Sequence, residues 1–264
     1  IKEIDGVKVF IAPGMEHRVG VLLRFPEALP EGSDRIRDTD PQKEGREPIE
    51  PLGENPQSEK VARVVRRFLE RVREVLKEEQ KANYLLLRGF SQKPKIESFQ
   101  ERFGLRACAI AVYPMYRGLA SLVGMELIPF EGQTIKDEIR ALKENLERYD
   151  FFFLHIKKTD SYGEDGNYEG KIRVIEEFDA HLPEILDLKP SVLVITGDHS
   201  TPSVLKGHSW HPVPVLLHSP YVLGFTAERF TERECLRGEL GTFPSYKLIN
   251  LMLAHSMRLA KFGA

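Results

Sequence analysis

The sequence has few cysteines, no long apolar run and no excess of charge of one sign. Its 264 residues include two cysteines, Cys108 and Cys235, too few for a disulfide framework and consistent with a reducing compartment. No apolar stretch approaches the roughly 20 residues that a bilayer-crossing helix needs. The 38 basic and 40 acidic side chains give a formal net charge of -2, which provides no overall field to attract nucleic acid or an anionic membrane. We therefore expect a cytoplasmic protein that binds its ligands at local sites.

The composition is that of a folded protein with a sizeable core. Hydrophobic residues make up 41% of the chain, charged residues 30%, and the mean hydropathy is -0.32, which excludes fibrous and disordered classes. The chain has roughly twice the common domain length of about 100–150 residues, so it can form one large domain or two smaller ones. It begins with Ile1 instead of Met, inside a run typical of a strand pair. We therefore expect a further N-terminal segment in the natural protein.

The first quarter of the chain predicts a hairpin, an irregular segment and a helix. Two extended runs, 7–11 and 19–25, flank a Pro13-Gly14 turn signal and predict a β-hairpin. Residues 26–57 are rich in proline and charge without periodicity, which predicts a long irregular segment. Apolar residues at three- and four-residue steps between 61 and 76 then predict an amphipathic helix.

From residue 84 onward, short apolar runs alternate with helical periods. The runs fall at 84–87, 107–112, 151–155, 192–196 and 213–217. One helix is indicated by Thr134 with Asp137 three residues later, the form of a capping box. A second is indicated by apolar residues at 172, 175, 178 and 182. This alternation predicts an α/β fold with a mainly parallel sheet flanked by helices, and such sheets bind ligands at the carboxyl ends of their strands.

Five side chains with metal-binding chemistry follow or precede these predicted strands. Asp160 and Glu164 follow the run at 151–155, Asp198 and His199 follow the run at 192–196, and His208 precedes the last run. Any one of them has a plainer interpretation, since aspartate often caps a helix or forms a turn and a lone histidine is often structural. Together they favour a metal centre. Carboxylates with imidazoles and no thiolates suit Zn²⁺ or Mn²⁺ at an open site and argue against a structural zinc site.

Several motifs carry a family resemblance. They are His155-Ile156-Lys157-Lys158-Thr159-Asp160, Thr196-Gly197-Asp198-His199-Ser200-Thr201-Pro202 and Gly207-His208-Ser209, with further likeness at 16–19, 38–41, 85–89 and 111–114. These segments resemble the archaeal-type, cofactor-independent (2,3-bisphosphoglycerate-independent) phosphoglycerate mutases of the alkaline phosphatase superfamily. The resemblance spans nearly the whole chain.

The resemblance implies an alkaline-phosphatase-like α/β domain that binds two divalent metal ions, with an inserted α+β cap domain that closes over the substrate. We expect residues 1–112 to form a cap portion and residues 113–264 a metal-binding portion. The implied enzyme is an isomerase of glycolysis that interconverts 2-phosphoglycerate and 3-phosphoglycerate, small phosphorylated carboxylic acids, through a phosphoserine. Asp160 and His208 would bind one metal ion, and Asp198 and His199 the other. The implied substrate contacts are His17, Arg18, Asp38, Asp40, Arg88 and Arg117.

Two departures from the family pattern affect these expectations. Glu164 stands where the family has a histidine. A carboxylate can still bind a metal ion and favours harder ions. We therefore expect Mn²⁺, with Zn²⁺ or Mg²⁺ as alternatives, and no organic cofactor. The family's nucleophilic serine and a further metal-binding aspartate belong to a segment that precedes anything matching Ile1. The chain thus offers no catalytic nucleophile, and we expect the 264 residues alone to be inactive. A phosphatase or phosphonate hydrolase of the same superfamily, and a non-catalytic metal-binding relative, are the alternatives.

Overall fold

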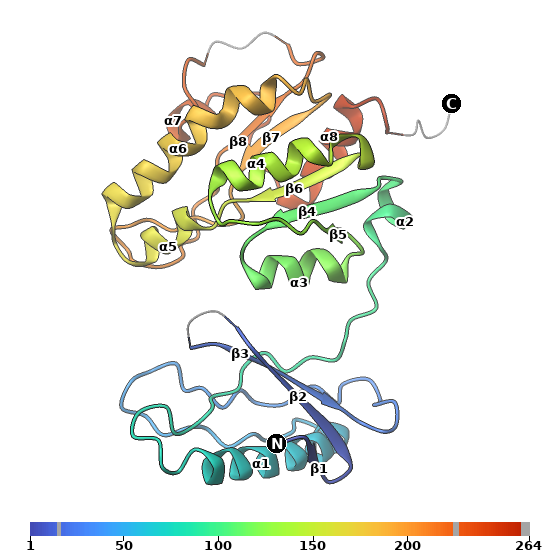
Figure 1. The fold of residues 1–264 in the computed structure, drawn as a ribbon, viewed down its shortest axis with the longest axis vertical. Coiled ribbons are helices and arrows are strands. Elements are labelled where there is room, and N and C mark those ends of the chain that lie inside the picture. Colours follow the sequence, from blue (N-terminus) through green and yellow to red (C-terminus); the bar gives the residue numbers. More distant parts are fainter. Residues whose placement is uncertain (15–16, 224–226, 260–264) are drawn as a thin grey trace. The chain divides into compact units, whose positions relative to one another are not determined.

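A computed structural model describes residues 1–14, 17–223 and 227–259 and divides the chain into two units, Ile1–Glu97 and Ser98–Ala264 (Figure 1). The first unit opens with an antiparallel sheet, in which β1 (Glu3–Ile4), β2 (Val7–Pro13) and β3 (Val19–Arg24) lie in that order. The turn between β1 and β2 is Asp5-Gly6, and both residues have positive φ, as a two-residue hairpin turn requires. The predicted hairpin of β2 and β3 is confirmed.

The predicted amphipathic helix is α1 (Pro56–Val75), which begins earlier than its apolar pattern because Asn55 and Ser58 form a capping box before it. Its apolar face provides most of the core of the first unit. Phe68 and Val65 are fully buried there and pack in one cluster with Val7 on β2. A helix with one apolar stripe is stabilised mainly by this kind of packing.

The irregular segment predicted before α1 contains no named helix or strand between β3 and α1, and a single bridge joins Ile36 to Gly53. The fully buried Thr39 anchors it: its backbone N–H donates to Leu87 O at 2.8 Å, and its Oγ1 accepts from the Leu87 N–H at 2.7 Å. The prediction of a strand at 84–87 is wrong. A side-chain hydroxyl, instead of a backbone carbonyl, satisfies the Leu87 N–H, so no ladder extends from this contact.

The second unit is the α/β part of the chain (Figure 1). Its elements are α2 (Phe99–Phe103), β4 (Ala107–Ala111), α3 (Pro114–Leu122), β5 (Glu126–Leu127), α4 (Ile135–Glu144), the 3-10 turn η1 (Leu146–Arg148), β6 (Phe151–His155), α5 (Lys158–Glu164), α6 (Tyr168–Leu186), β7 (Leu193–Thr196), β8 (Val215–His218), α7 (Glu232–Cys235), the 3-10 turn η2 (Ser245–Lys247) and α8 (Leu248–His255).

A parallel sheet lies at the centre of this unit, with the order β5-β4-β6. β4 is buried along its whole length, as a central parallel strand should be. The predicted capping box is confirmed at the start of α4, where Thr134 and Asp137 cap each other. Ile139 on α4 and Val174 on α6 form a buried cluster against which Leu154 of β6 and Leu193 of β7 pack. These two helices therefore hold β6 and β7 on a common core.

Two details of the predicted architecture differ from the structure. β7 and β8 pair antiparallel in a separate two-stranded sheet, with Leu193 opposite His218 and Thr196 opposite Val215. Parallel strands need a long crossover, usually a helix, whereas 197–214 contains no named helix. The boundary between the units falls at Glu97 and Ser98, earlier than the expected 112/113, because β4 pairs with β5 and β6 and so belongs to the second unit.

No helix of the described residues combines the length and apolar character that a membrane span requires.

Candidate metal centre

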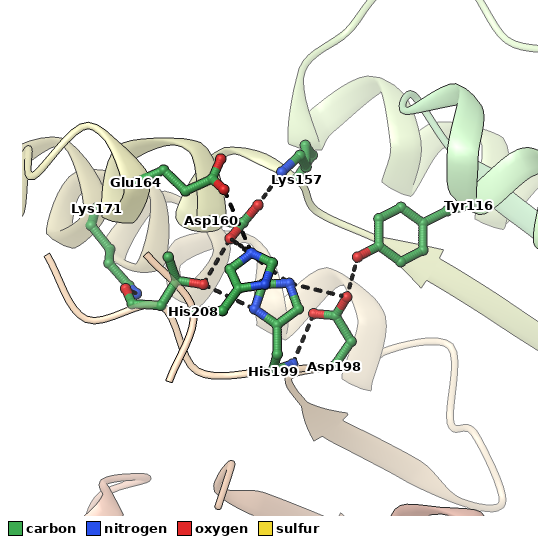
Figure 2. Close-up of polar contacts among 9 residues, drawn as sticks. Tyr116, Lys157, Asp160, Glu164, Lys171, Asp198, His199 and His208 are labelled. Atoms are coloured by element: carbon green, nitrogen blue, oxygen red, sulfur yellow. Dashed lines mark hydrogen bonds and ion pairs between the residues drawn. The ribbon is translucent and has the colours of Figure 1, made fainter. Parts of the chain in front are cut away.

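The five metal-ligand candidates come together beyond the carboxyl ends of β6 and β7 (Figure 2). α5 begins almost directly after β6 and carries Asp160 and Glu164 four residues apart, which places both on one face of the helix. Asp198 and His199 follow β7. An antiparallel bridge between residues 200 and 209 closes the following loop, and it brings the ring of His208 to 3.8 Å from that of His199, measured between centroids.

The distances within this cluster are those of groups that could share a cation. His208 Nε2 lies 3.4 Å from Asp160 Oδ1 and 3.6 Å from Glu164 Oε1. His199 Nε2 lies 3.8 Å from the same Asp160 oxygen and 3.6 Å from Asp198 Oδ2. One ligand atom from each of Asp160, His199 and His208 lies within 4.8 Å of the other two. Two metal–ligand bonds of about 2.0–2.3 Å span up to about 4.6 Å, and the distances of 3.4 and 3.8 Å from Asp160 Oδ1 to His208 and His199 lie within that span, so these residues fit a divalent ion.

Asp160 is the most tightly held of the five. Its side chain is 16% exposed, it forms an ion pair with Lys157, and it accepts a hydrogen bond of 2.7 Å from Thr201 Oγ1. Burial alone would raise the pKa of the Asp160 carboxyl, but the hydrogen bonds from Lys157 and Thr201 outweigh burial and hold the pKa below its ordinary value. The carboxylate is therefore kept in the charged form that a cation needs.

Asp198 is held by Tyr116, which in turn stacks on His155. Tyr116, on α3, donates its hydroxyl proton to Asp198 Oδ2, and its ring stacks on that of His155 at 3.6 Å between centroids. Burial and the neighbouring Asp198 carboxylate both raise the pKa of Tyr116, so the phenol stays protonated and remains a donor. Burial also lowers the pKa of His155, whose buried Nδ1 has no hydrogen-bond partner among the described residues. The neutral ring of His155 thus serves as a platform for Tyr116.

The predicted substrate contacts are divided between the two units. Asp38 Oδ1 accepts from the Gly89 N–H at 2.9 Å, and Arg88 pairs with Asp40 at 3.5 Å, so the two segments that carry these residues meet in the first unit.

His17 and Arg18 are exposed between β2 and β3 of the same unit. Glu16, part of the same motif, lies outside the described residues. Arg117 belongs to the second unit, where it extends from α3 and donates to Ala111 O at 3.3 Å, at the carboxyl end of β4.

Sequence reasoning missed three residues that hold the cluster together. Lys157 and Thr201 stand inside the quoted motifs, so their spacing from Asp160 and His199 was a usable signal. Tyr116 gave none, because it reaches Asp198 across 82 positions of the chain and follows a different strand.

The fold and this donor set define the class of protein. A family model described as the Metalloenzyme superfamily matches residues 20–255, and the chain belongs to that superfamily. The expected α/β fold of alkaline phosphatase type is confirmed by this membership, and the superfamily implies that the site binds divalent metal.

The relatives of the chain narrow the class further. Over all 264 residues it is 69% identical to an Aquifex aeolicus protein named "Probable 2,3-bisphosphoglycerate-independent phosphoglycerate mutase", so the resemblance drawn from the motifs is confirmed. The chain spans 65% of the length of that relative.

Two solved structures share the fold. A Pyrococcus horikoshii protein is 33% identical with a TM-score of 0.74, over 79% of this chain and 60% of that one. The cofactor-independent phosphoglycerate mutase of Thermoplasma acidophilum matches with a TM-score of 0.67 at 24% identity, over 96% of this chain and 66% of that one. At 24% identity, this second match shows similarity of fold alone.

Proposed function

We propose that this chain carries the metal centre of a cofactor-independent phosphoglycerate mutase, an isomerase that interconverts 2-phosphoglycerate and 3-phosphoglycerate. The observation that carries the proposal is the convergence of Asp160, Glu164, Asp198, His199 and His208 at the carboxyl ends of two strands. The identity of 69% to a relative so named, over the whole of this chain, supports the same reaction. A glycolytic role would place the protein in the cytoplasm.

The donor set favours two divalent ions, with Mn²⁺ the proposed metal. His208 lies close to both Asp160 and Glu164, and these three would hold one ion, while Asp198 and His199 would hold the second. Three carboxylates with two imidazoles suit a hard or borderline cation, and Glu164 adds charge that favours Mn²⁺ over Zn²⁺. When bound, such ions neutralise charge on the transferring phosphoryl group and lower the pKa of a hydroxyl nucleophile.

Two further groups of residues would orient the metal ligands and bind the substrate. Lys157 holds Asp160 in place, and Tyr116 does the same for Asp198. The guanidinium groups of Arg88 and Arg117 have the fork geometry that binds phosphate and carboxylate, the two anionic groups of phosphoglycerate. His17, Arg18, Asp38 and Asp40 complete the proposed substrate set.

The hydroxyl that accepts the phosphoryl group is proposed to be a serine in the part of the relatives that this chain does not span. The structure is compatible with additional strands here. Within the described residues β6 pairs only with β4 and β7 only with β8, so each presents a free edge. The side chains of β6 are only half buried, although four of its five residues are Phe or Leu. Apolar strand edges of this kind are ordinarily paired or covered.

The test is to incubate the full-length protein and Mn²⁺ with 3-phosphoglycerate and to follow the products by phosphorus NMR. We expect 2-phosphoglycerate to appear until equilibrium is reached, with no net release of inorganic phosphate. Inorganic phosphate as the main product would instead identify a phosphatase of the same superfamily. No turnover at all with Mn²⁺, Zn²⁺ or Mg²⁺ would identify a non-catalytic relative.

A further inference from the structure

The buried hydroxyl of Thr201 joins two of the metal-ligand candidates. Thr201 is only 4% exposed, and its Oγ1 lies 2.7 Å from Asp160 Oδ1 and 2.9 Å from His199 Nδ1. Asp160 belongs to α5, whereas His199 follows β7, so this one oxygen connects the two chain segments that supply the cluster.

The single proton of that hydroxyl fixes the direction of both hydrogen bonds. A carboxylate can only accept, so Thr201 Oγ1 donates to Asp160. The same oxygen must then accept from His199, and the ring proton of His199 therefore sits on Nδ1. The lone pair of the neutral ring is left on Nε2, which faces Asp160 Oδ1 at 3.8 Å and Asp198 Oδ2 at 3.6 Å. His199 thus presents to the cluster the one nitrogen that can bind a cation.

The backbone of Thr201 is fixed by contacts that do not involve its hydroxyl. Lys171 Nζ donates to the Thr201 carbonyl at 2.7 Å. On the other side α5 approaches so closely that a Cβ on Gly163 would lie 2.4 Å from the same carbonyl oxygen. A substitution that removes only the hydroxyl can therefore separate its hydrogen bonds from the packing of the loop against α5.

We propose that Thr201 is a positioning residue, which sets the tautomer of His199 and orients the Asp160 carboxylate for a divalent cation. The proposal rests on the metal centre of the proposed function and is independent of the reaction that the centre serves. Histidines that bind metals usually donate their second ring N–H to a neighbouring acceptor, and losing such a partner typically costs about 10- to 100-fold in metal affinity. Thr201 is such an acceptor and at the same time a donor to a second ligand.

The first test compares the Mn²⁺ affinities of variants of the full-length protein by electron paramagnetic resonance titration. Thr201→Val keeps the shape of the side chain but loses the hydroxyl, and we expect its affinity to fall about 10- to 100-fold. Thr201→Ser restores the hydroxyl and should bind nearly as tightly as the wild type. Ser200→Ala is the matched control, because the Ser200 hydroxyl donates to His211 O at 3.1 Å, away from the cluster. Wild-type affinity in Thr201→Val would overturn the proposal, as would an equal loss in Thr201→Ser.

The second test uses the wild-type protein, so its result does not depend on whether a variant folds. In wild-type protein labelled with ¹⁵N-histidine and loaded with diamagnetic Zn²⁺, we expect the ring proton of His199 on Nδ1, protected from exchange with water. A His199 ring without a proton on Nδ1 would refute the inference. These readouts are separate from turnover: a protein whose Mn²⁺ affinity depends on the Thr201 hydroxyl but which leaves phosphoglycerate unchanged would refute only the proposed function.

Discussion

The substitution Asp198→Asn removes the charge of one ligand candidate and keeps the size of its side chain. Asp198 Oδ2 faces His199 Nε2 and accepts from Tyr116. We predict that Asp198→Asn abolishes turnover in the full-length protein, because removing a ligand charge from ions that stabilise the transition state costs several kcal/mol. Steady-state assays with saturating Mn²⁺ measure the effect. Asp179→Asn, at an exposed position of α6, is the control and should keep full activity. An active Asp198→Asn variant would show that this carboxylate is not a ligand.

A second prediction for a single residue concerns Glu138 and the dependence of stability on pH. Glu138 is only 3% exposed on α4, and burial, helped by the nearby Asp137, raises its pKa from 4.5 to about 8. The folded state therefore binds this proton more tightly than the unfolded state, and the free energy of unfolding contributed by Glu138 falls as the pH rises from about 4.5 to about 8.

Glu138→Gln removes this titration, since the amide is neutral at every pH. We expect the variant to be more stable than the wild type at pH 8, by on the order of 3 kcal/mol, with the advantage disappearing near pH 4. Urea unfolding across this pH range provides the measurement, and Glu177→Gln at an exposed position of α6 is the control. If Glu138→Gln and the wild type show the same pH dependence, Glu138 ionises freely in the folded protein.

Among individual residues, the sequence could predict the ligands better than their supports. The five candidates follow or precede predicted strands, and the rule that parallel sheets bind ligands at their carboxyl edge places them together. One support, Tyr116, acts through a single hydrogen bond to Asp198, 82 positions away in the chain. No local period or propensity encodes such a contact, so only the folded structure shows it.

The packing of α5 against the loop after β7 is tested with two glycines. A Cβ on Gly163 would lie 2.4 Å from the Thr201 carbonyl oxygen and 2.9 Å from its Cγ2, whereas a Cβ on Gly118 of α3 would contact nothing within 4 Å. We expect Gly163→Ala to destabilise the protein by about 1–3 kcal/mol and to weaken Mn²⁺ binding, because α5 carries Asp160 and Glu164. Gly118→Ala should stabilise it by up to about 1 kcal/mol, as expected for a helix interior. Chemical unfolding with parallel Mn²⁺ titrations measures both, and a Gly163→Ala variant that binds Mn²⁺ normally would contradict this role of the packing.

At the level of elements, strong local patterns gave correct predictions and long-range pairing did not. α1 and α4 were predictable because an apolar stripe and a capping side chain act within a few residues. The direction of β8 was not, since it depends on how 197–214 returns to β7. The same limit explains the wrong prediction of a strand at 84–87. There the buried Thr39, far away in the sequence, bonds to Leu87 in place of a partner strand.

The described residues form three buried clusters, one in the first unit and two in the second, and one of those in the second unit supports the strands that precede the metal-ligand candidates. Phe68 is fully buried in the first unit, while Ile139 is 1% exposed in the cluster that supports β6 and β7. Phe68→Ala should cost about 3–5 kcal/mol and Ile139→Ala about 2–5 kcal/mol of stability. We expect only Ile139→Ala to weaken Mn²⁺ binding, measured under conditions where both variants remain folded. Weaker Mn²⁺ binding in Phe68→Ala would show that the metal centre depends on the first unit.

The central claim is that Asp160, Glu164, Asp198, His199 and His208 bind divalent metal ions. The most direct measurement is an anomalous difference map at the manganese absorption edge from crystals of the full-length protein grown with Mn²⁺. We predict peaks at about 2.0–2.3 Å from carboxylate oxygens and imidazole nitrogens of this cluster, with one of them between Asp160 and His208, whose ligand atoms lie 3.4 Å apart. A map with no peak at these residues, or with manganese bound only elsewhere, would contradict the account.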